Sequence, residues 1–266
     1  NIHILNVEYI NLRERFIMKI DHLVINVDPN YQRESEDVQQ IKKAGLPYNI
    51  KKGKGTKGFK ATNIWTGNEY FELITITNND GGGWRPEWVH AYNSGHRGLI
   101  CLMIDVNNID AIVHRLQKEG IFISNPERIK IEFFFKLFSK TMPWQNSFLN
   151  FFENIPLQIG FQQMDSEKIR KGFEKYMVPN SYENNISGIT QIHIAGDFTS
   201  SDFSMLRTVF ENTIDNENQL IVQLENSQNI IFEKTKDYCV KVSLKNDNSS
   251  FSRKTCKVEN ILINID

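Results

Sequence analysis

Apolar stretches separated by short polar segments divide the chain into units that repeat one order of elements. In the first unit, the apolar and β-branched residues 20–27 predict a strand, and the polar segment 34–44 predicts a helix that ends before Gly45 and Pro47. Three more strands are predicted after this helix, at residues 48–52, 59–65 and 70–76. The order of the unit is therefore βαβββ.

The same order recurs about 80 residues later. Residues 99–106 predict a strand, and Asn108 is expected to cap a helix whose apolar side chains recur at helical spacing before Gly120. Three strands are predicted after this helix, at residues 120–124, 131–137 and 156–162. Two such units can close into one curved mixed sheet with a cleft and with helices outside.

A third and smaller βαβββ-like unit is predicted near the carboxyl end. Residues 189–195 predict a strand and 202–212 a helix, and further strands are expected at 220–224, 229–234 and 238–244. Alone, this unit would leave one side of its sheet uncovered. We therefore expect it to dock on the first two units or to pair with its counterpart in a homodimer.

These units give an α+β fold class, with tandem βαβββ modules in a curved mixed sheet and a third, smaller module. Met18 and the residues after it resemble a natural start, so the residues before it are expected to lie upstream of the fold. The expected divisions are 1–17 upstream, 18–165 paired βαβββ domain, 166–188 helix and linker, and 189–266 third module.

Composition excludes several classes of function. With 31 basic and 32 acidic residues among 266, the net charge of −1 creates no overall field that would attract nucleic acid or an anionic membrane. The three cysteines are far apart and form neither a disulfide framework nor a metal-spaced pair, which favours a cytoplasmic location. No apolar run approaches the roughly 20 residues of a membrane helix. The expected partner is a small molecule, without nucleic acid or membrane.

A histidine and a glutamate stand among apolar residues of two predicted strands. His22 shares a strand face with Val24, and Glu72 shares one with Ile74, so both side chains are expected to face one cleft. An imidazole and a carboxylate in one place can act as an acid–base pair or bind a metal. A structural hydrogen bond inside a polar cleft is the other interpretation.

A long loop follows the first unit and contains three consecutive glycines and two tryptophans. Aromatic and arginine side chains on such a loop can cover a flat or anionic ligand, although they can equally pin the loop to the body of the protein. His96 and Arg97, which follow the loop, are expected near the mouth of the cleft. The predicted substrate-binding residues are Tyr70, Trp84, Arg85, Trp88, His96 and Arg97.

Two other signals predict no site. Residues 53–58 have the glycine spacing of a dinucleotide-binding loop, but a strand follows instead of the required helix, so no nucleotide cofactor is expected. His193 looks like a counterpart of His22. The register from Asp197 places Gln191 in that position, however, and we interpret His193 as structural.

Four segments carry a resemblance to a known family: Ile20–Val24, Glu69–Ile74, Gly95–Leu99 and Asp105–Asp110. On these segments the chain resembles the glyoxalase-like domain proteins of the vicinal oxygen chelate superfamily, which groups glyoxalases, bleomycin resistance proteins and extradiol dioxygenases. The resemblance covers residues 18–165 well. It implies a glyoxalase-like enzyme of lyase or isomerase type that acts on a carbonyl or vicinal-oxygen substrate. A non-catalytic protein that sequesters a small molecule is the alternative, and an interaction scaffold built by the third module is a third hypothesis.

The resemblance also implies one divalent metal, such as Zn, Ni, Mn or Fe, bound by the first and last strands of each unit. His22 and Glu72 match these positions in the first unit, and alignment puts Cys101 and Gln158 there in the second. Cys101 is a soft ligand and Gln158 a neutral, weak one, whereas oxygen chemistry favours imidazole and carboxylate. A metal-free pocket, with Cys101 as a small buried apolar residue, is the alternative.

Overall fold

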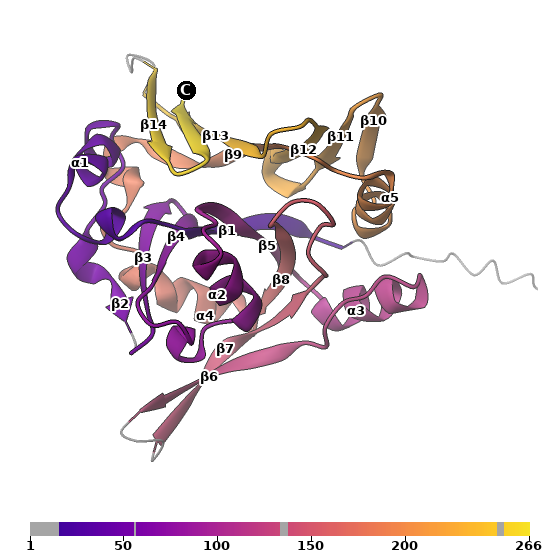
Figure 1. Ribbon diagram of the computed structural model, residues 1–266, viewed down its shortest axis with the longest axis horizontal. Coiled ribbons are helices and arrows are strands. Elements are labelled where there is room, and N and C mark those ends of the chain that lie inside the picture. The colour runs from indigo at the N-terminus through magenta and orange to yellow at the C-terminus, as the bar shows by residue number, and fades with distance from the viewer. Residues whose placement is uncertain (1–15, 56, 134–137, 249–252) are drawn as a thin grey trace, which may run out of the picture.

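The computed structural model describes residues 16–55, 57–133, 138–248 and 253–266. Over these residues the chain is α+β, with five α-helices and two mixed β-sheets. In Figure 1 the second sheet lies above the first, and β6 and β7 project below the body of the protein. No helix in the described ranges combines the length and the apolar character that a membrane crossing requires.

The first sheet contains two βαβββ units, in the strand order β2-β3-β4-β1-β5-β8-β7-β6. In each unit the first strand runs parallel to the last, and the two units join through antiparallel β1 and β5. The first unit consists of β1 (Met18–Asn26), α1 (Glu36–Lys43), β2 (Lys54–Gly55), β3 (Phe59–Thr66) and β4 (Glu69–Ile76). The second consists of β5 (Gly98–Val106), α3 (Ile109–Lys118), β6 (Glu127–Phe133), β7 (Phe138–Phe148) and β8 (Gln158–Met164).

The helices α1 and α3 begin at polar capping residues, and each has an apolar stripe along one side. The side chain of Ser35 accepts a hydrogen bond from the Val38 amide at the start of α1, and Asn108 caps α3 in the same way. Both helices turn buried apolar residues toward one face of the first sheet, which is also the face that contacts the second sheet. The opposite face of the first sheet, which we call the inner face, is thus left for other side chains.

The second sheet contains the third unit and an extension of three strands. The unit consists of β9 (Ile186–Gly196), α5 (Ser200–Val209), β10 (Thr213–Asn216), β11 (Gln219–Gln223) and β12 (Asn229–Lys234). The extension consists of β13 (Cys239–Asn246), β14 (Lys254–Val258) and β15 (Ile261–Ile265). β13 pairs with β9 as β5 pairs with β1, and β15 pairs with β13 as β8 pairs with β5. The extension is therefore a partial fourth unit, and α4 (Glu167–Phe173) connects the two sheets.

Several elements differ from the sequence-based prediction. Residues 48–52 form no strand: Tyr48 packs into the core, its hydroxyl donates to the Tyr31 carbonyl at 2.7 Å, and Ile50–Lys52 forms a short 3-10 helix. The segment 120–124 contains only an isolated bridge at Ile123, and the strand predicted at 238–244 belongs to the partial fourth unit. Part of the predicted strand 131–137 lies outside the described residues. Among the strands of the described ranges, five were not predicted: β2, β7, β10, β14 and β15.

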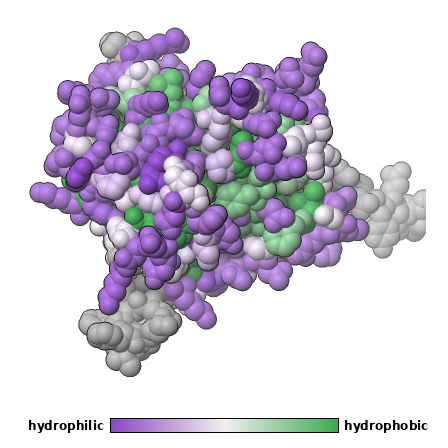
Figure 2. Space-filling model, in the orientation of Figure 1, coloured by the Kyte–Doolittle hydropathy of each residue, from purple (hydrophilic) through white to green (hydrophobic). Residues whose placement is uncertain are grey.

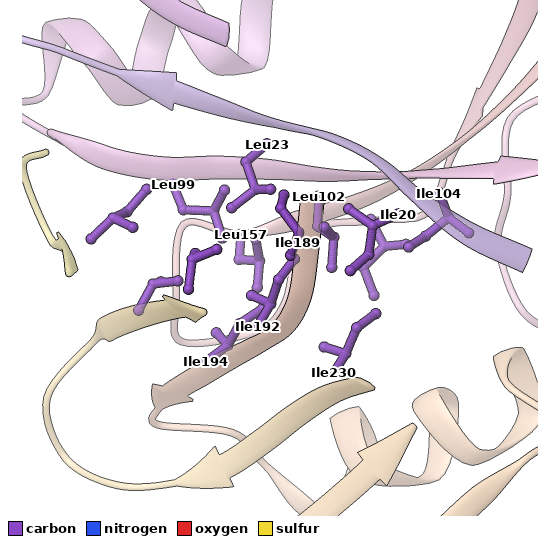
Figure 3. Close-up of a cluster of buried hydrophobic side chains, with 14 of the residues drawn as sticks. Ile20, Leu23, Leu99, Leu102, Ile104, Leu157, Ile189, Ile192, Ile194 and Ile230 are labelled. Carbon is purple, nitrogen blue, oxygen red and sulfur yellow. The ribbon is translucent and has the colours of Figure 1, made fainter. Parts of the chain in front are cut away.

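The third unit docks on the first two through an apolar layer between the sheets. Figure 3 shows these side chains meeting across the junction. The first sheet and the loop before β8 supply Ile20, Leu23, Leu99, Leu102, Ile104 and Leu157, and the second sheet supplies Ile189, Ile192, Ile194 and Ile230. One continuous core thus spans both sheets. This is the first of the two expected arrangements, in which the third unit docks on the first two. Pairing with a second chain stays a prediction.

Candidate active site

A polar group lies on the inner face of the first sheet, among apolar side chains. His22 on β1 and Glu72 on β4 meet there, with 3.8 Å between Nε2 and Oε2. Both side chains are largely withdrawn from solvent, at 7% exposure for His22 and 20% for Glu72. The two side chains therefore face each other on the inner face, as the sequence analysis expected.

A third residue, Asp21, fixes the orientation of the histidine. Its Oδ1 lies 2.7 Å from His22 Nδ1, and its Oδ2 accepts a hydrogen bond of 2.9 Å from Gln162 Nε2 on β8. A carboxylate at this distance favours the tautomer with the proton on Nδ1. The unprotonated Nε2 then faces Glu72.

A β-bulge brings Asp21 to the same side as its neighbour. Ile20 pairs with Ile104 on β5, but His22 pairs with Met103, so Asp21 is an extra residue in β1. In a regular strand, adjacent side chains point to opposite faces, and a bulge interrupts this alternation. The Asp21–His22 contact depends on that interruption.

The surroundings of the pair change its acid–base properties. Burial raises the pKa of Glu72, the imidazole of His22 opposes this shift, and the nearby Asp21 carboxylate adds to it. Tyr70, two residues before Glu72 on β4, stacks on the His22 ring with 4.4 Å between centroids and 14° between planes. The ring is thus held by a hydrogen bond at one edge and by an aromatic face.

The loop after β4 covers another part of the inner face. It contains α2 (Pro86–Asn93), which was predicted only as part of a loop, and Trp88 of α2 is buried and donates from Nε1 to Gln158 Oε1 at 2.9 Å. Trp84 lies 5.7 Å from Trp88, and the Arg85 guanidinium stands 3.8 Å above the Phe148 ring. Three of the predicted substrate-binding residues therefore gather beside β7 and β8.

Two other predicted substrate-binding residues lie near the second sheet. His96 Nε2 is 3.2 Å from the Leu99 carbonyl, and its ring stacks on Tyr238 at 6.2 Å. Arg97 stacks on Tyr92 at 3.5 Å and donates to the Tyr92 carbonyl at 2.9 Å. His96 and Arg97 therefore make their contacts near the second sheet and not around His22.

Comparison with known proteins supports the fold. No protein-family model matches the chain, and no curated protein matches it. A hypothetical protein from Staphylococcus aureus superposes with a TM-score of 0.71 at 16% identity, over 94% of this chain and 99% of that one. An extradiol ring-cleaving dioxygenase from B. fuscum superposes with a TM-score of 0.53 at 8% identity, over 94% of this chain and 71% of that one. The chain therefore shares the fold of these two solved structures. At these identities the likeness establishes the fold and leaves the reaction open.

The metal donors implied by the vicinal oxygen chelate resemblance are only partly available. Cys101 is fully buried, its Sγ contacts Met103 Sδ at 3.5 Å, and burial raises the pKa of its thiol. Both amide atoms of Gln158 are engaged, because its Nε2 donates to the Leu149 carbonyl at 2.7 Å and its Oε1 accepts from Trp88. His22 Nε2 and Glu72 remain as two well-placed donors.

The strand register also differs between the two pairs of implied metal donors, His22 with Glu72 and Cys101 with Gln158. Cys101 pairs directly with Gln158, whereas His22 pairs with Tyr70, two residues before Glu72. Within the described ranges, no three His, Cys, Asp or Glu side chains form a group that could hold a metal ion. The four residues therefore do not fit a four-donor centre in this arrangement, and we assign no reaction step to a metal.

Sequence reasoning missed Asp21 and Gln162 as members of the site. Asp21 is buried at 7% exposure and Gln162 at 7%. A buried aspartate beside a strand histidine was the available signal, but simple alternation places it on the opposite face. Gln162 was missed because its position beside Asp105 follows from the pairing of β5 with β8, which the sequence alone does not show.

Proposed function

We propose that this chain is a glyoxalase-like small-molecule enzyme of lyase or isomerase type, acting on a carbonyl or vicinal-oxygen substrate at the inner face of the first sheet. The arrangement of Asp21, His22 and Glu72 supports this proposal most strongly. An imidazole oriented by one carboxylate faces a second carboxylate, whose pKa burial raises, at 3.8 Å. Oriented groups with shifted pKa values are typical of acid–base sites.

The chemistry that suits this pair is proton transfer at a carbon next to a carbonyl. One group removes the proton, and the electrons of the C–H bond form an enediolate with its negative charge on the carbonyl oxygen. The second group, in its protonated form, then delivers its proton to that oxygen or to the neighbouring carbon. The raised pKa brings Glu72 closer to neutral pH, where a general base or acid is most effective. Asp21 stabilises the imidazolium that forms when Nε2 of His22 accepts a proton.

The neighbouring aromatic group is proposed to hold the rest of the substrate. Trp84 packs on Phe59 at 4.4 Å as well as on Trp88, and Arg85 lies over both Trp88 and Phe148. A guanidinium among aromatic rings suits a ligand with one flat part and one anionic group. The same group favours the alternative function, non-catalytic sequestration of a small aromatic compound, because it needs no acid–base pair.

The two functions are separated by hydrogen exchange and ligand binding in the same protein. The full-length chain is incubated in deuterium oxide with α-hydroxycarbonyl compounds and with the hemithioacetal of glutathione and methylglyoxal, and deuterium at carbon is measured by NMR. We expect incorporation that falls about 100-fold or more in His22→Gln and in Glu72→Gln. Glu217→Gln, which replaces an exposed carboxylate between β10 and β11, is the matched control and should retain full activity.

The opposite outcome has a specific signature. If the wild-type chain exchanges no proton while one of these compounds quenches tryptophan fluorescence with saturation, the protein sequesters its ligand and the enzymatic proposal is wrong. Equal activity in the wild type and in His22→Gln would also contradict the assignment of the acid–base pair.

A further inference from the structure

The second sheet repeats the arrangement of the proposed active site on its own solvent-facing side. In the first sheet, Glu72 pairs with Val24, which lies two residues after His22 on β1. In the second sheet, Glu233 on β12 pairs with Ala195, which lies two residues after His193 on β9. The two His–Glu pairs therefore occupy the same positions in their parallel ladders.

The antiparallel ladders extend this correspondence to a cysteine. Val24 pairs with Cys101 on β5, and Ala195 pairs with Cys239 on β13. A histidine, a glutamate and a cysteine thus share one set of register positions in both sheets. Sequence reasoning had placed Gln191 in the position of His22, because it counted back from Asp197 and had no information on strand pairing.

The second pair is in closer contact than the first. His193 Nε2 lies 2.6 Å from Glu233 Oε2, with 21% and 29% of the two side chains exposed. The alternating side chains Ile192 and Ile194 point into the junction between the sheets, so His193 points the other way. The partner that sequence analysis did not find for His193 is Glu233.

The two sites differ in what lies above them. On the inner face of the first sheet, Cys101 is fully buried beneath side chains of the loop that contains α2. On the second sheet Cys239 is exposed. It lines a cavity of about 290 Å³, just below the usual range of about 300–1,000 Å³ for small-molecule sites. The lining residues are His193, Ala195, Glu233, Thr235, Lys236, Asp237, Cys239 and Lys241.

The lysines of this lining suit an anionic group of a ligand. The lining contains two carboxylates, Glu233 and Asp237, and two ammonium groups, and Glu233 is engaged by His193. Across the described ranges no carboxylate lies within salt-bridge distance of the Lys236 or Lys241 ammonium, so both can bind an incoming acid. Lys241 pairs directly with His193 across the β9–β13 ladder, which places its charge beside the His–Glu pair.

We propose that this cavity is a second ligand site, which binds a small carboxylate-bearing molecule. Lys241 and Lys236 bind the carboxylate of the ligand, and the His193–Glu233 pair hydrogen-bonds its neighbouring polar group. Because the site lies on the second sheet, it does not depend on the acid–base function proposed for the first.

Cys239 provides a direct report on occupancy, since it lines the cavity and the other two cysteines are buried. The full-length chain is treated with the neutral thiol reagent 4,4′-dithiodipyridine, with benzoate as the carboxylate probe. We expect benzoate to slow the labelling of Cys239 with saturation, beyond the effect of sodium chloride at equal ionic strength. Loss of the reaction in Cys239→Ser assigns the signal to this residue.

The lysine variants test the chemistry of the site. In the double variant Lys236→Gln/Lys241→Gln, the benzoate concentration for half-maximal protection should rise by about tenfold or more, as expected for lost charge-assisted hydrogen bonds. Lys257→Gln, an exposed lysine on β14 of the same sheet, is the matched control and should leave it unchanged. His22→Gln and Glu72→Gln should also leave it unchanged, which separates this test from that of the proposed function.

Two results would overturn the proposal. Protection by benzoate that does not exceed that of sodium chloride would mean that no carboxylate site exists beside Cys239. Saturable protection that is equally strong in the double lysine variant would mean that the ligand is held without these ammonium groups. Thermal unfolding of each variant verifies that the second sheet remains folded.

Discussion

Glu69 lies at the junction of the two sheets and should make the protein less stable as the pH rises. A salt-bridged acid has the opposite effect, because its pKa is lowered. Its Oε1 accepts a hydrogen bond of 3.0 Å from Gln228 Nε2, and Gln228 Oε1 accepts one of 2.9 Å from the Ile20 amide. Burial raises the pKa of Glu69 from 4.5 to about 7, although hydrogen bonds from Ile189 and Gln228 oppose this shift.

The sign and size of the effect follow from this shift. The folded protein favours the protonated carboxyl, so the favourable contribution is complete below pH 4.5 and is lost as the pH rises to about 7. A shift of this size corresponds to at most about 3 kcal/mol, and partial exposure to solvent reduces it toward about 2 kcal/mol. Glu69→Gln removes the ionisable group and keeps an oxygen that accepts from Gln228.

Urea unfolding at pH 8 and at pH 4.5 tests this reasoning. Relative to the wild type, Glu69→Gln should gain about 2 kcal/mol in the free energy of unfolding at pH 8 and almost nothing at pH 4.5. Glu217→Gln, which replaces an exposed carboxylate between β10 and β11, should show no such pH-dependent difference. A Glu69→Gln protein that is less stable than the wild type at pH 8 would refute the assignment of a destabilising buried carboxylate.

Three further outcomes are expected. Leu102→Ala, which opens a cavity in the layer between the sheets, should lower the free energy of unfolding by about 2–5 kcal/mol, measured in urea. Trp88→Phe removes the hydrogen bond to Gln158 and should make Cys101 react faster with a neutral thiol reagent, measured by mass spectrometry of the labelled peptide. Asp21→Asn should lower the exchange activity by about tenfold or more and leave substrate affinity nearly unchanged, measured as kcat and KM separately.

Much of the architecture could be predicted because it rests on local pattern. The first two units have strands that are continuous apolar runs and helices with polar caps, so β1, β3, β4 and β5 were placed close to their observed bounds. In the partial fourth unit β13 overlaps a predicted strand, whereas β14 and β15 were missed because each is only five residues long. Lys254 and Lys257 also interrupt the apolar pattern of β14.

The site could be predicted only in part, for a reason of strand geometry. His22 and Glu72 follow from the two-residue period of regular strands, and their meeting also needs the parallel pairing of β1 with β4. Asp21 needs the bulge, and Glu233 as the partner of His193 needs the register of β12 on β9. Pairing and bulges are set by tertiary packing, so they leave little trace in a single sequence.

The orientation of the His22 ring tests the central claim, that Asp21 and Glu72 make His22 one half of an acid–base pair. Long-range proton–nitrogen NMR on the full-length chain, labelled with ¹⁵N in histidine, reads which ring nitrogen carries the proton. We predict a protonated Nδ1 and an unprotonated Nε2 for His22 at pH 8, with the Nε2 signal shifted by Glu72→Gln and the tautomer preference lost in Asp21→Asn. A proton on Nε2 in the wild type, or signals that neither substitution changes, would contradict the claim.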